Sequence, residues 1–568
     1  MKDLTAKLAL LLLLGALFSA NAPAQIGQTR SAPSSGAQTA QAAAELPAAS
    51  ITSLRSYIHD AWQTLTRSMT DCRSLADPKL KQQPVLYMPA DSQVPSQVQQ
   101  LEDTCHIRVQ QLSKNISRLG DLKPDQIESQ GLLYLPNPYV VPGGRFNEMY
   151  GWDSYFIIRG LLSDNQPELA RGMIENFFYE IEHYGAVLNA NRTYYFTRSQ
   201  PPFLTSMIMG YYQYQKAHGH DDHEWLQNAY KYAQRDYELW THEPHLAGNT
   251  GLARYFDLGE GPVPEMGDDP HYYAEVASYL LLHPNSTYSY FATSTSASSQ
   301  PPFGPTFTFQ LCGETKTAGT DVQPCAAQQK LSLSEDYYKG DRAMRESGFD
   351  ISFRFGPFSG STHHFAPVCL NSLLYKAEMD MAEMASILGR ATETNQWKER
   401  ARQRQAAMNK YFWNAQKGMF FDYDFTRQQQ SSYDYATSFY PLWTGLATAQ
   451  QAQALQRNLA TFERPGGIAM SDQTTGVQWD LPYGWAPLQL ITVEGLRRYG
   501  FNADADRISR EFVSTVFENF QRDGTIREKY NVVTRSSESN VTAGYKTNVV
   551  GFGWTNGVTL ELLRGLKK

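Results

Sequence analysis

The amino-acid sequence predicts an all-α protein whose helices pair up in an α/α toroid. Apolar residues recur every three or four positions over long stretches, as they do on the buried face of an amphipathic helix. The alternation of apolar and polar residues that is typical of strands is scarce. One predicted helix pair leads directly into an aromatic and acidic loop, and such loops at one end of a toroid build its site.

The N-terminus has the three parts of a secretory signal. Two lysines precede an apolar run over residues 8–18, and small residues follow it. This order predicts a signal peptide over residues 1–24, cleaved after Ala22 or Ala24. The run is too short for a membrane span, and an uncleaved anchoring helix is the alternative. We therefore expect a periplasmic or secreted protein with no stable membrane insertion after cleavage.

Three further segments follow the predicted signal peptide. Residues 25–50 are mostly Ala, Gln, Ser, Thr and Pro, a composition that predicts a disordered tether. Residues 51–120 are expected to form an N-terminal helical segment. No second low-complexity linker occurs, so residues 121–568 are predicted to be one large catalytic domain.

The helical pattern is clearest in the middle of the chain. Residues 168–181 carry one apolar stripe. The same pattern covers residues 370–388 and, after Gly389, residues 397–412. The loop that follows this pair, residues 420–424, reads Phe-Phe-Asp-Tyr-Asp. A helix pair followed by such a loop indicates the toroid.

One stretch interrupts the helical pattern. Residues 284–332 are rich in Ser, Thr, Pro and Gly, and they are predicted to be a long loop insertion. Insertions of this kind often cover active sites, and they are also tolerated as surface decoration. Both interpretations stay open.

The five cysteines agree with an oxidising compartment. Cys72 and Cys105 bracket one segment, Cys312 and Cys325 bracket another, and Cys369 is left over. The two local pairings are the expected disulfides, although sequence cannot decide connectivity. No cysteine and histidine cluster has metal-ligand spacing, so no metal site is predicted.

Charge and composition limit the partners. The net charge is −7 and no basic run occurs, which argues against nucleic acid and suits a neutral substrate. Aromatic residues make up 13% of the chain. Flat rings pack against sugar faces, but they also fill protein cores.

Two stretches concentrate turn, charged and ring residues, namely residues 142–155 and 478–487. In the first, Arg145 and Asp153 are suited to bind sugar hydroxyls, and Trp152 offers a ring face. Chemistry alone leaves open that both stretches are packed loops.

These stretches resemble the two signature motifs of the trehalase family, PGGRFxExYxWD and QWDxPxGWxP. The resemblance covers about residues 120–568. It implies an (α/α)6 barrel, hydrolysis of α,α-trehalose to two glucose molecules with inversion, a small disaccharide as partner, and no cofactor. A monomer is expected. The resemblance continues through residues 189–195, 198–202, 346–350, 528–530 and 551–557.

Inverting hydrolysis of a glycoside needs two carboxyl groups. A protonated acid serves the leaving oxygen, and an ionised base activates water from about 6.5–9.5 Å away. The acid and the base must therefore have different pKa values. The resemblance implies Asp350 as the acid and Glu528 as the base. Without it, Asp350 reads as a turn residue and Glu528 as a surface glutamate. The sugar-binding residues that the resemblance implies are Arg145, Trp152, Asp153, Asn189, Arg198, Gln200, Glu265 and Gly348.

The chain departs from the family pattern at three places. Val263 stands where the family has an arginine of the sugar site, and valine cannot donate a hydrogen bond. Residues 542–547 lack the glutamate of the family's closing loop, and Cys369 stands where the family has Asp. If trehalose is the substrate, another cation must replace the arginine. Lys546 and Arg354 are the predicted candidates.

Three functional hypotheses therefore stand. The first is an exported trehalase. The second is an inverting α-glucosidase of altered specificity, which Val263 favours. The third is a catalytically weak sugar-binding relative, against which Asp350 and Glu528 argue, because a binding module has no use for two carboxylates across a water.

Overall fold

Among the residues that the structure describes, six buried helices form a closed inner ring. The computed structural model of the chain describes residues 48–76, 83–268, 271–283, 290–292, 304–311 and 327–566. Within these residues each inner helix packs against the next in chain order, and α19 packs against α6 to close the ring. The inner helices are α6 (Gly151–Ser163), α8 (Leu204–Ala217), α12 (Val368–Ile387), α14 (Tyr440–Thr444), α17 (Ala486–Arg498) and α19 (Gly553–Leu566).

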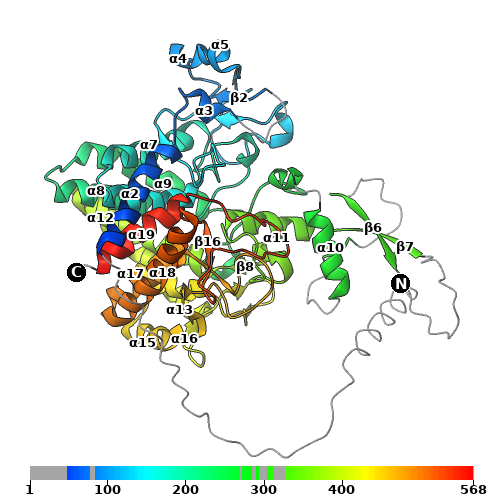
Figure 1. The fold of residues 1–568 in the computed structure, drawn as a ribbon, viewed down its shortest axis with the longest axis vertical. Coiled ribbons are helices and arrows are strands. Elements are labelled where there is room, and N and C mark those ends of the chain that lie inside the picture. Colours follow the sequence, from blue (N-terminus) through cyan, green and yellow to red (C-terminus); the bar gives the residue numbers. More distant parts are fainter. Residues whose placement is uncertain are drawn as a thin grey trace, which may run out of the picture. The chain divides into compact units, whose positions relative to one another are not determined.

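A second layer of helices surrounds the ring. Each of these follows or precedes an inner helix in the chain, so inner and outer helices alternate. Figure 1 shows α2 beside α19, which completes the last pair. The predicted all-α (α/α)6 toroid is confirmed. The outer helices are α2 (Ala48–Leu65), α7 (Pro167–His183), α9 (His223–Trp240), α13 (Ala391–Tyr411), α15 (Ala449–Arg457), α16 (Leu459–Phe462) and α18 (Asn502–Asp523).

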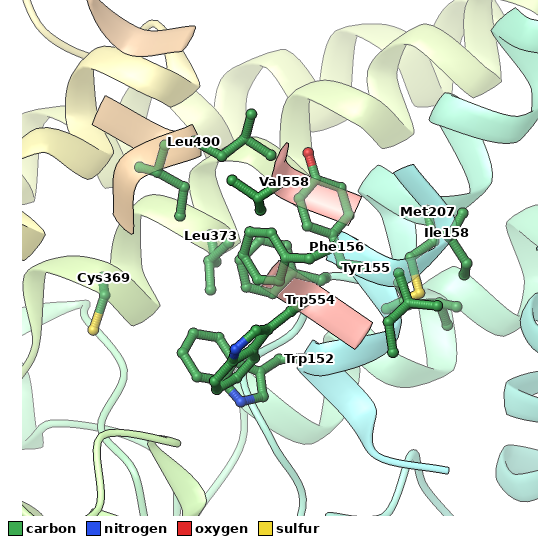
Figure 2. Close-up of a cluster of buried hydrophobic side chains, with 14 of the residues drawn as sticks. Trp152, Tyr155, Phe156, Ile158, Met207, Cys369, Leu373, Leu490, Trp554 and Val558 are labelled. Atoms are coloured by element: carbon green, nitrogen blue, oxygen red, sulfur yellow. The ribbon is translucent and has the colours of Figure 1, made fainter. Parts of the chain in front are cut away.

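Apolar side chains fill the middle of the ring. Figure 2 shows that Phe156 of α6, Leu373 of α12 and Val558 of α19 converge there. Glycines allow α6 and α19 to approach closely, because a Cβ atom on Gly160 would lie 2.4 Å from the Cα atom of Gly557. The ring is therefore a packed core, and its site lies at one end.

The helices predicted from periodicity agree with the structure. The apolar stripe at residues 168–181 is α7, and the pair at residues 370–388 and 397–412 is α12 and α13. The segment 51–120, expected to be helical, is helical in α2 and in three short helices. Its described residues also contain two strands of a parallel sheet, and the residues of the first, β2 (Val85–Met88), are all buried without the alternation that reveals a strand. The short helices are α3 (Cys72–Leu75), α4 (Ser96–Gln99) and α5 (Leu101–Cys105).

Pairs of short strands link the loops to one another. β2 pairs in parallel with β3 and β4, and the other pairings are antiparallel. The pair β15 and β16 joins the entry of α17 to the segment after Glu528. The strands outside the insertion are β1 (Thr66–Arg67), β2 (Val85–Met88), β3 (Arg108–Gln111), β4 (Leu132–Leu133), β5 (Tyr139–Val140), β8 (Phe365–Ala366), β9 (Trp413–Asn414), β10 (Met419–Phe420), β11 (Tyr423–Asp424), β12 (Gln429–Gln430), β13 (Glu463–Arg464), β14 (Gly467–Ile468), β15 (Tyr483–Trp485) and β16 (Lys529–Asn531).

The predicted insertion at residues 284–332 is described only in part. Its described residues include an antiparallel hairpin of β6 (Thr306–Leu311) and β7 (Ala327–Ser332). Two helices flank it, α10 (Tyr272–Leu282) and α11 (Glu335–Glu346), and α11 leads toward Asp350.

The cysteine predictions are confirmed where the structure describes the residues. Cys72 and Cys105 form a disulfide, and Cys369 is free and buried. Cys312 and Cys325 lie outside the described residues, as do the predicted signal peptide and nearly all of the predicted tether. None of the described helices combines the length and apolar character needed to cross a membrane.

Candidate active site

A cavity of about 670 Å³ opens at the end of the ring where the inner helices begin. α6 contributes Asp153 and α19 contributes Trp554 from their first turns, and Trp485 directly precedes α17. This volume is in the range of small-molecule sites. All of the predicted site residues line the cavity, namely Arg145, Trp152, Asp153, Asn189, Arg198, Gln200, Glu265, Gly348, Asp350 and Glu528.

Aromatic rings form one wall of the cavity. Trp479 stacks on Trp485 with ring centroids 3.9 Å apart, and Trp152 meets Trp554 edge-on at 5.5 Å. Figure 2 shows Trp152 and Trp554 together at the end of the buried cluster. Gly348 has a φ of +74°, and a Cβ atom there would lie 2.8 Å from the Trp152 ring. Only glycine fits at this position.

Asp350 lies in the loop after α11. Gln478 Nε2 donates to its main-chain oxygen at 2.5 Å, and the Trp479 N–H donates to the oxygen of Ile351 at 3.1 Å. The second signature motif thus positions this carboxyl group, whose side chain is 25% exposed. Burial raises the pKa of Asp350 to about 7, although nearby arginines oppose the shift. A carboxyl group with this pKa is protonated often enough near neutral pH to act as an acid.

Glu528 precedes β16. Its N–H donates to the Val549 oxygen at 2.9 Å, and Trp554 Nε1 donates to the Glu528 oxygen at 3.3 Å. Its Oε2 atom lies 3.1 Å from Nζ of Lys529, a cation with no exposed side-chain surface. The two side chains form an ion pair, and a carboxylate is the kind of group that a general base requires.

Asp153 is electrostatically coupled to both carboxyl groups. Burial raises its pKa well above the usual carboxyl value, and Glu528 and Asp350 raise it further. Asp153, Asp350 and Glu528 are three of the four carboxyl groups that line the cavity, and Glu265 is the fourth. Environments that push neighbouring carboxyl groups apart in pKa are typical of acid–base sites.

A hydrogen-bonded group of polar residues forms another part of the lining. Arg198 Nε donates to Asn189 Oδ1 at 2.7 Å, and Arg198 also pairs with Glu265. Burial alone would raise the pKa of Glu265, but Arg198 and Arg345 lower it below its usual value. Arg145 differs from these residues because it is exposed, and its guanidinium lies 4.8 Å from the Phe146 ring centroid.

Val263 is buried and does not line the cavity. Its N–H donates to the Tyr273 hydroxyl at 2.9 Å. The two predicted replacements for the missing arginine differ in position. Lys546 lines the cavity but pairs with Glu275 at 3.0 Å. Arg354 is buried and does not line the cavity.

Arg345, near the end of α11, was missed by the sequence analysis. It lines the cavity, its Nη1 atom lies 3.8 Å from Oδ2 of Asp350, and the same atom donates to the Tyr545 hydroxyl at 2.8 Å. In the sequence it resembles any helical arginine. Its position shortly before Asp350 was the available signal.

A buried carboxylate holds Arg345 in place. Asp341, one turn earlier in α11, lies 3.3 Å from Arg345 Nη2. The hydroxyls of Tyr272 and Tyr273 donate to Asp341 at 3.1 and 2.9 Å. The Tyr273 hydroxyl also accepts a hydrogen bond from the Val263 N–H. Val263 therefore belongs to the group of residues that holds Arg345 in place.

The third departure from the family pattern, Cys369, lies away from the cavity. Cys369 is in the first turn of α12, where Arg354 donates to its Sγ atom at 3.4 Å. Asp422 binds the same guanidinium through both oxygens, at 2.6 and 2.7 Å. The acidic loop at residues 420–424, expected to help build the site, therefore neutralises a buried arginine and does not line the cavity.

Comparisons with known proteins agree on one family. The trehalase family model matches residues 26–300 and 310–567. The cytosolic neutral trehalase of Saccharomyces cerevisiae is 36% identical over 450 residues, which are 74% of this chain and 55% of that protein. The cytosolic neutral trehalase of Emericella nidulans is 36% identical over 458 residues, or 74% and 56%. The chain thus spans a little over half the length of these curated relatives.

A solved structure resembles the whole fold. The neutral trehalase Nth1 from Saccharomyces cerevisiae superposes with a TM-score of 0.71 at 30% identity, covering 91% of this chain and 94% of that chain.

The same comparisons contradict the predicted location. Relatives at 34–36% identity are named cytosolic enzymes. The prediction of a secreted or periplasmic protein with a signal peptide is therefore wrong. It rested on the composition of the first 24 residues, and a short apolar run between lysines and small residues does not by itself decide the compartment.

Proposed function

Because this chain belongs to the trehalase family, we propose that it hydrolyses α,α-trehalose to two glucose molecules with inversion. The observation that carries the proposal is the pair of carboxyl groups in one cavity with opposite electrostatic settings. Asp350 has its pKa raised to about 7, and Glu528 is ion-paired with a buried lysine. An inverting glycosidase needs this combination of an acid and a base.

In the proposed reaction, protonated Asp350 donates its proton to the glycosidic oxygen as the bond to the anomeric carbon breaks. Ionised Glu528 removes a proton from water, and the water oxygen attacks that carbon from the opposite face. One glucose leaves with its α configuration, and the other forms as the β anomer. The proton lost by Asp350 is replaced from solvent, and Glu528 releases the one it gained.

The other lining residues bind the sugar in this proposal. Asn189, Arg198 and Glu265 present fixed donors and acceptors, since their mutual hydrogen bonds hold them in place. Trp152 offers a ring beside them, and Arg345 supplies a second buried guanidinium. Arg345 then takes the place of the family's arginine, which is Val263 in this chain. The predicted cations Lys546 and Arg354 do not take it.

Two substitutions and one product analysis test the proposal. Asp350→Asn and Glu528→Gln should each lower trehalose turnover by about 10²–10⁴-fold with the fold intact by circular dichroism. Glu518→Gln, which removes an exposed carboxylate of α18, is the matched control. NMR should detect β-glucose before mutarotation. Activity within about fivefold of the parent in either variant, or α-glucose alone, would overturn the assigned roles.

A changed substrate is the second candidate, favoured because Val263 stands where the family has an arginine. A panel of α-linked disaccharides separates the possibilities. Preference for another sugar would support altered specificity. Sugar binding without turnover would support a binding protein.

A further inference from the structure

A cluster of two imidazoles and one carboxylate lies outside the cavity. Asp336 is in the first turn of α11, and His363 and His364 end the short helix η7 (Thr362–His364). The Nε2 atom of each histidine lies 3.0 Å from Oδ1 of Asp336. We propose that these three side chains bind one transition-metal ion of the zinc class, which ties α11 to η7.

The distances fit such an ion. Zinc bonds of about 2.0–2.2 Å place neighbouring ligand atoms of a tetrahedron about 3.3–3.6 Å apart, so each of the two Nε2–Oδ1 separations needs to open only slightly from 3.0 Å. Two imidazoles and one carboxylate suit zinc and its neighbours and not calcium or magnesium, which prefer oxygen. The Asp336 side chain is 48% exposed, which leaves room for water as the fourth ligand.

His363 is held in position at the cluster. It is nearly buried, and Arg254 donates to its main-chain oxygen at 3.1 Å. Among the described residues, the Nδ1 atom of His363 has no hydrogen-bond partner. No protein group there decides which ring nitrogen carries the proton.

The cluster differs from the other histidine–carboxylate contacts of the described residues. His59 with Asp164 and His223 with Asp221 each join one imidazole to one carboxylate. Only the cluster at Asp336 brings three potential ligand atoms of the described chain within 4.8 Å of one another.

The position of the cluster indicates a structural role. Asp336 and His363 lie on either side of Asp350 in the sequence, and neither lines the cavity. α11 and η7 already pack together, and a Cβ atom on Gly340 would lie 1.7 Å from the oxygen of Gly360. An ion at the cluster would close the base of the loop that carries Asp350.

Zinc binding to the full chain tests this inference. Tag-free protein, treated with a chelator and dialysed, is titrated with Zn²⁺ by calorimetry at pH 7. We expect one saturable site and a rise in Tm that follows the same saturation. Asp336→Asn and His364→Ala should weaken binding by more than the about 10- to 100-fold that loss of an outer-shell partner costs. Co²⁺ should give the absorption of a tetrahedral site in the parent and not in His364→Ala.

His223→Ala is the matched control, since it removes the histidine of an exposed two-residue pair. It should leave Zn²⁺ binding unchanged. Absence of saturable binding by the parent would overturn the inference, and so would equal binding by the parent and His364→Ala. These outcomes do not depend on the proposed hydrolase activity, because the readouts are heat, Tm and absorption.

Discussion

Replacing Arg345 by methionine removes its charge and keeps most of its length. At 3.8 Å from Asp350, a full charge is worth about 4 kcal/mol at an effective dielectric constant of about 20. Asp341 lies 3.3 Å from the same guanidinium and offsets much of this. We therefore expect a net effect of about 1–2 kcal/mol, which is about one pKa unit.

The direction follows from the charges. Arg345 favours the ionised form of Asp350, so its loss raises the pKa of Asp350 from about 7 toward about 8. The proposed acid must be protonated, and activity falls as pH rises through this pKa. The alkaline limb of kcat/KM should therefore move to higher pH by about one unit. At pH 6 the rate should fall about 10- to 100-fold, because a buried charged donor is lost.

Initial rates of glucose release between pH 5 and 9 measure both effects. Arg345→Lys keeps the charge and should leave the alkaline limb near its original position, with a lower rate because the forked donor is gone. Arg510→Met, at a half-buried arginine of α18 outside the cavity lining, is the control. A folded Arg345→Met enzyme whose alkaline limb stays in place or moves to lower pH would refute the reasoning.

Three further predictions concern stability and the base. Asp350 has a folded-state pKa of about 7, above its unfolded value, so its contribution to stability is present below about pH 4 and is lost as pH rises through 7. Asp350→Asn should therefore raise Tm relative to the parent at pH 8 and not at pH 4, and an equal difference at both pH values would contradict this. Lys529→Met should lower kcat/KM by about 10-fold or more, because Glu528 loses the buried ammonium 3.1 Å from its Oε2 atom, while Lys529→Arg should retain part of the activity; an unchanged rate in a folded Lys529→Met enzyme would exclude a role for the ion pair. Gly557→Val should destabilise the chain by about 1–3 kcal/mol or more in urea unfolding, since a Cβ atom there would lie 2.2 Å from the Phe156 oxygen, and an unchanged midpoint would show that α6 and α19 can separate without cost.

The helix pairs could be predicted because periodicity is local. The stripe in α7 and the pair of α12 and α13 need only the spacing of apolar residues. The strand β2 could not be recognised in this way, because all four of its residues are buried and show no alternation. The compartment was predicted wrongly because composition at the N-terminus is compatible with more than one location.

The sequence by itself determined the toroid and ten of the residues that line its cavity, because long motifs place particular side chains at the entry of inner helices such as α6 and α17. Tertiary structure alone decided which charges act on them. Arg345 reaches Asp350 only because α11 ends beside the cavity, and Asp341 holds it there. Asp336 and His363 are 27 residues apart in the chain and meet only when α11 packs on η7. Charge interactions depend on distance in space, and spacing along the chain does not reveal that distance.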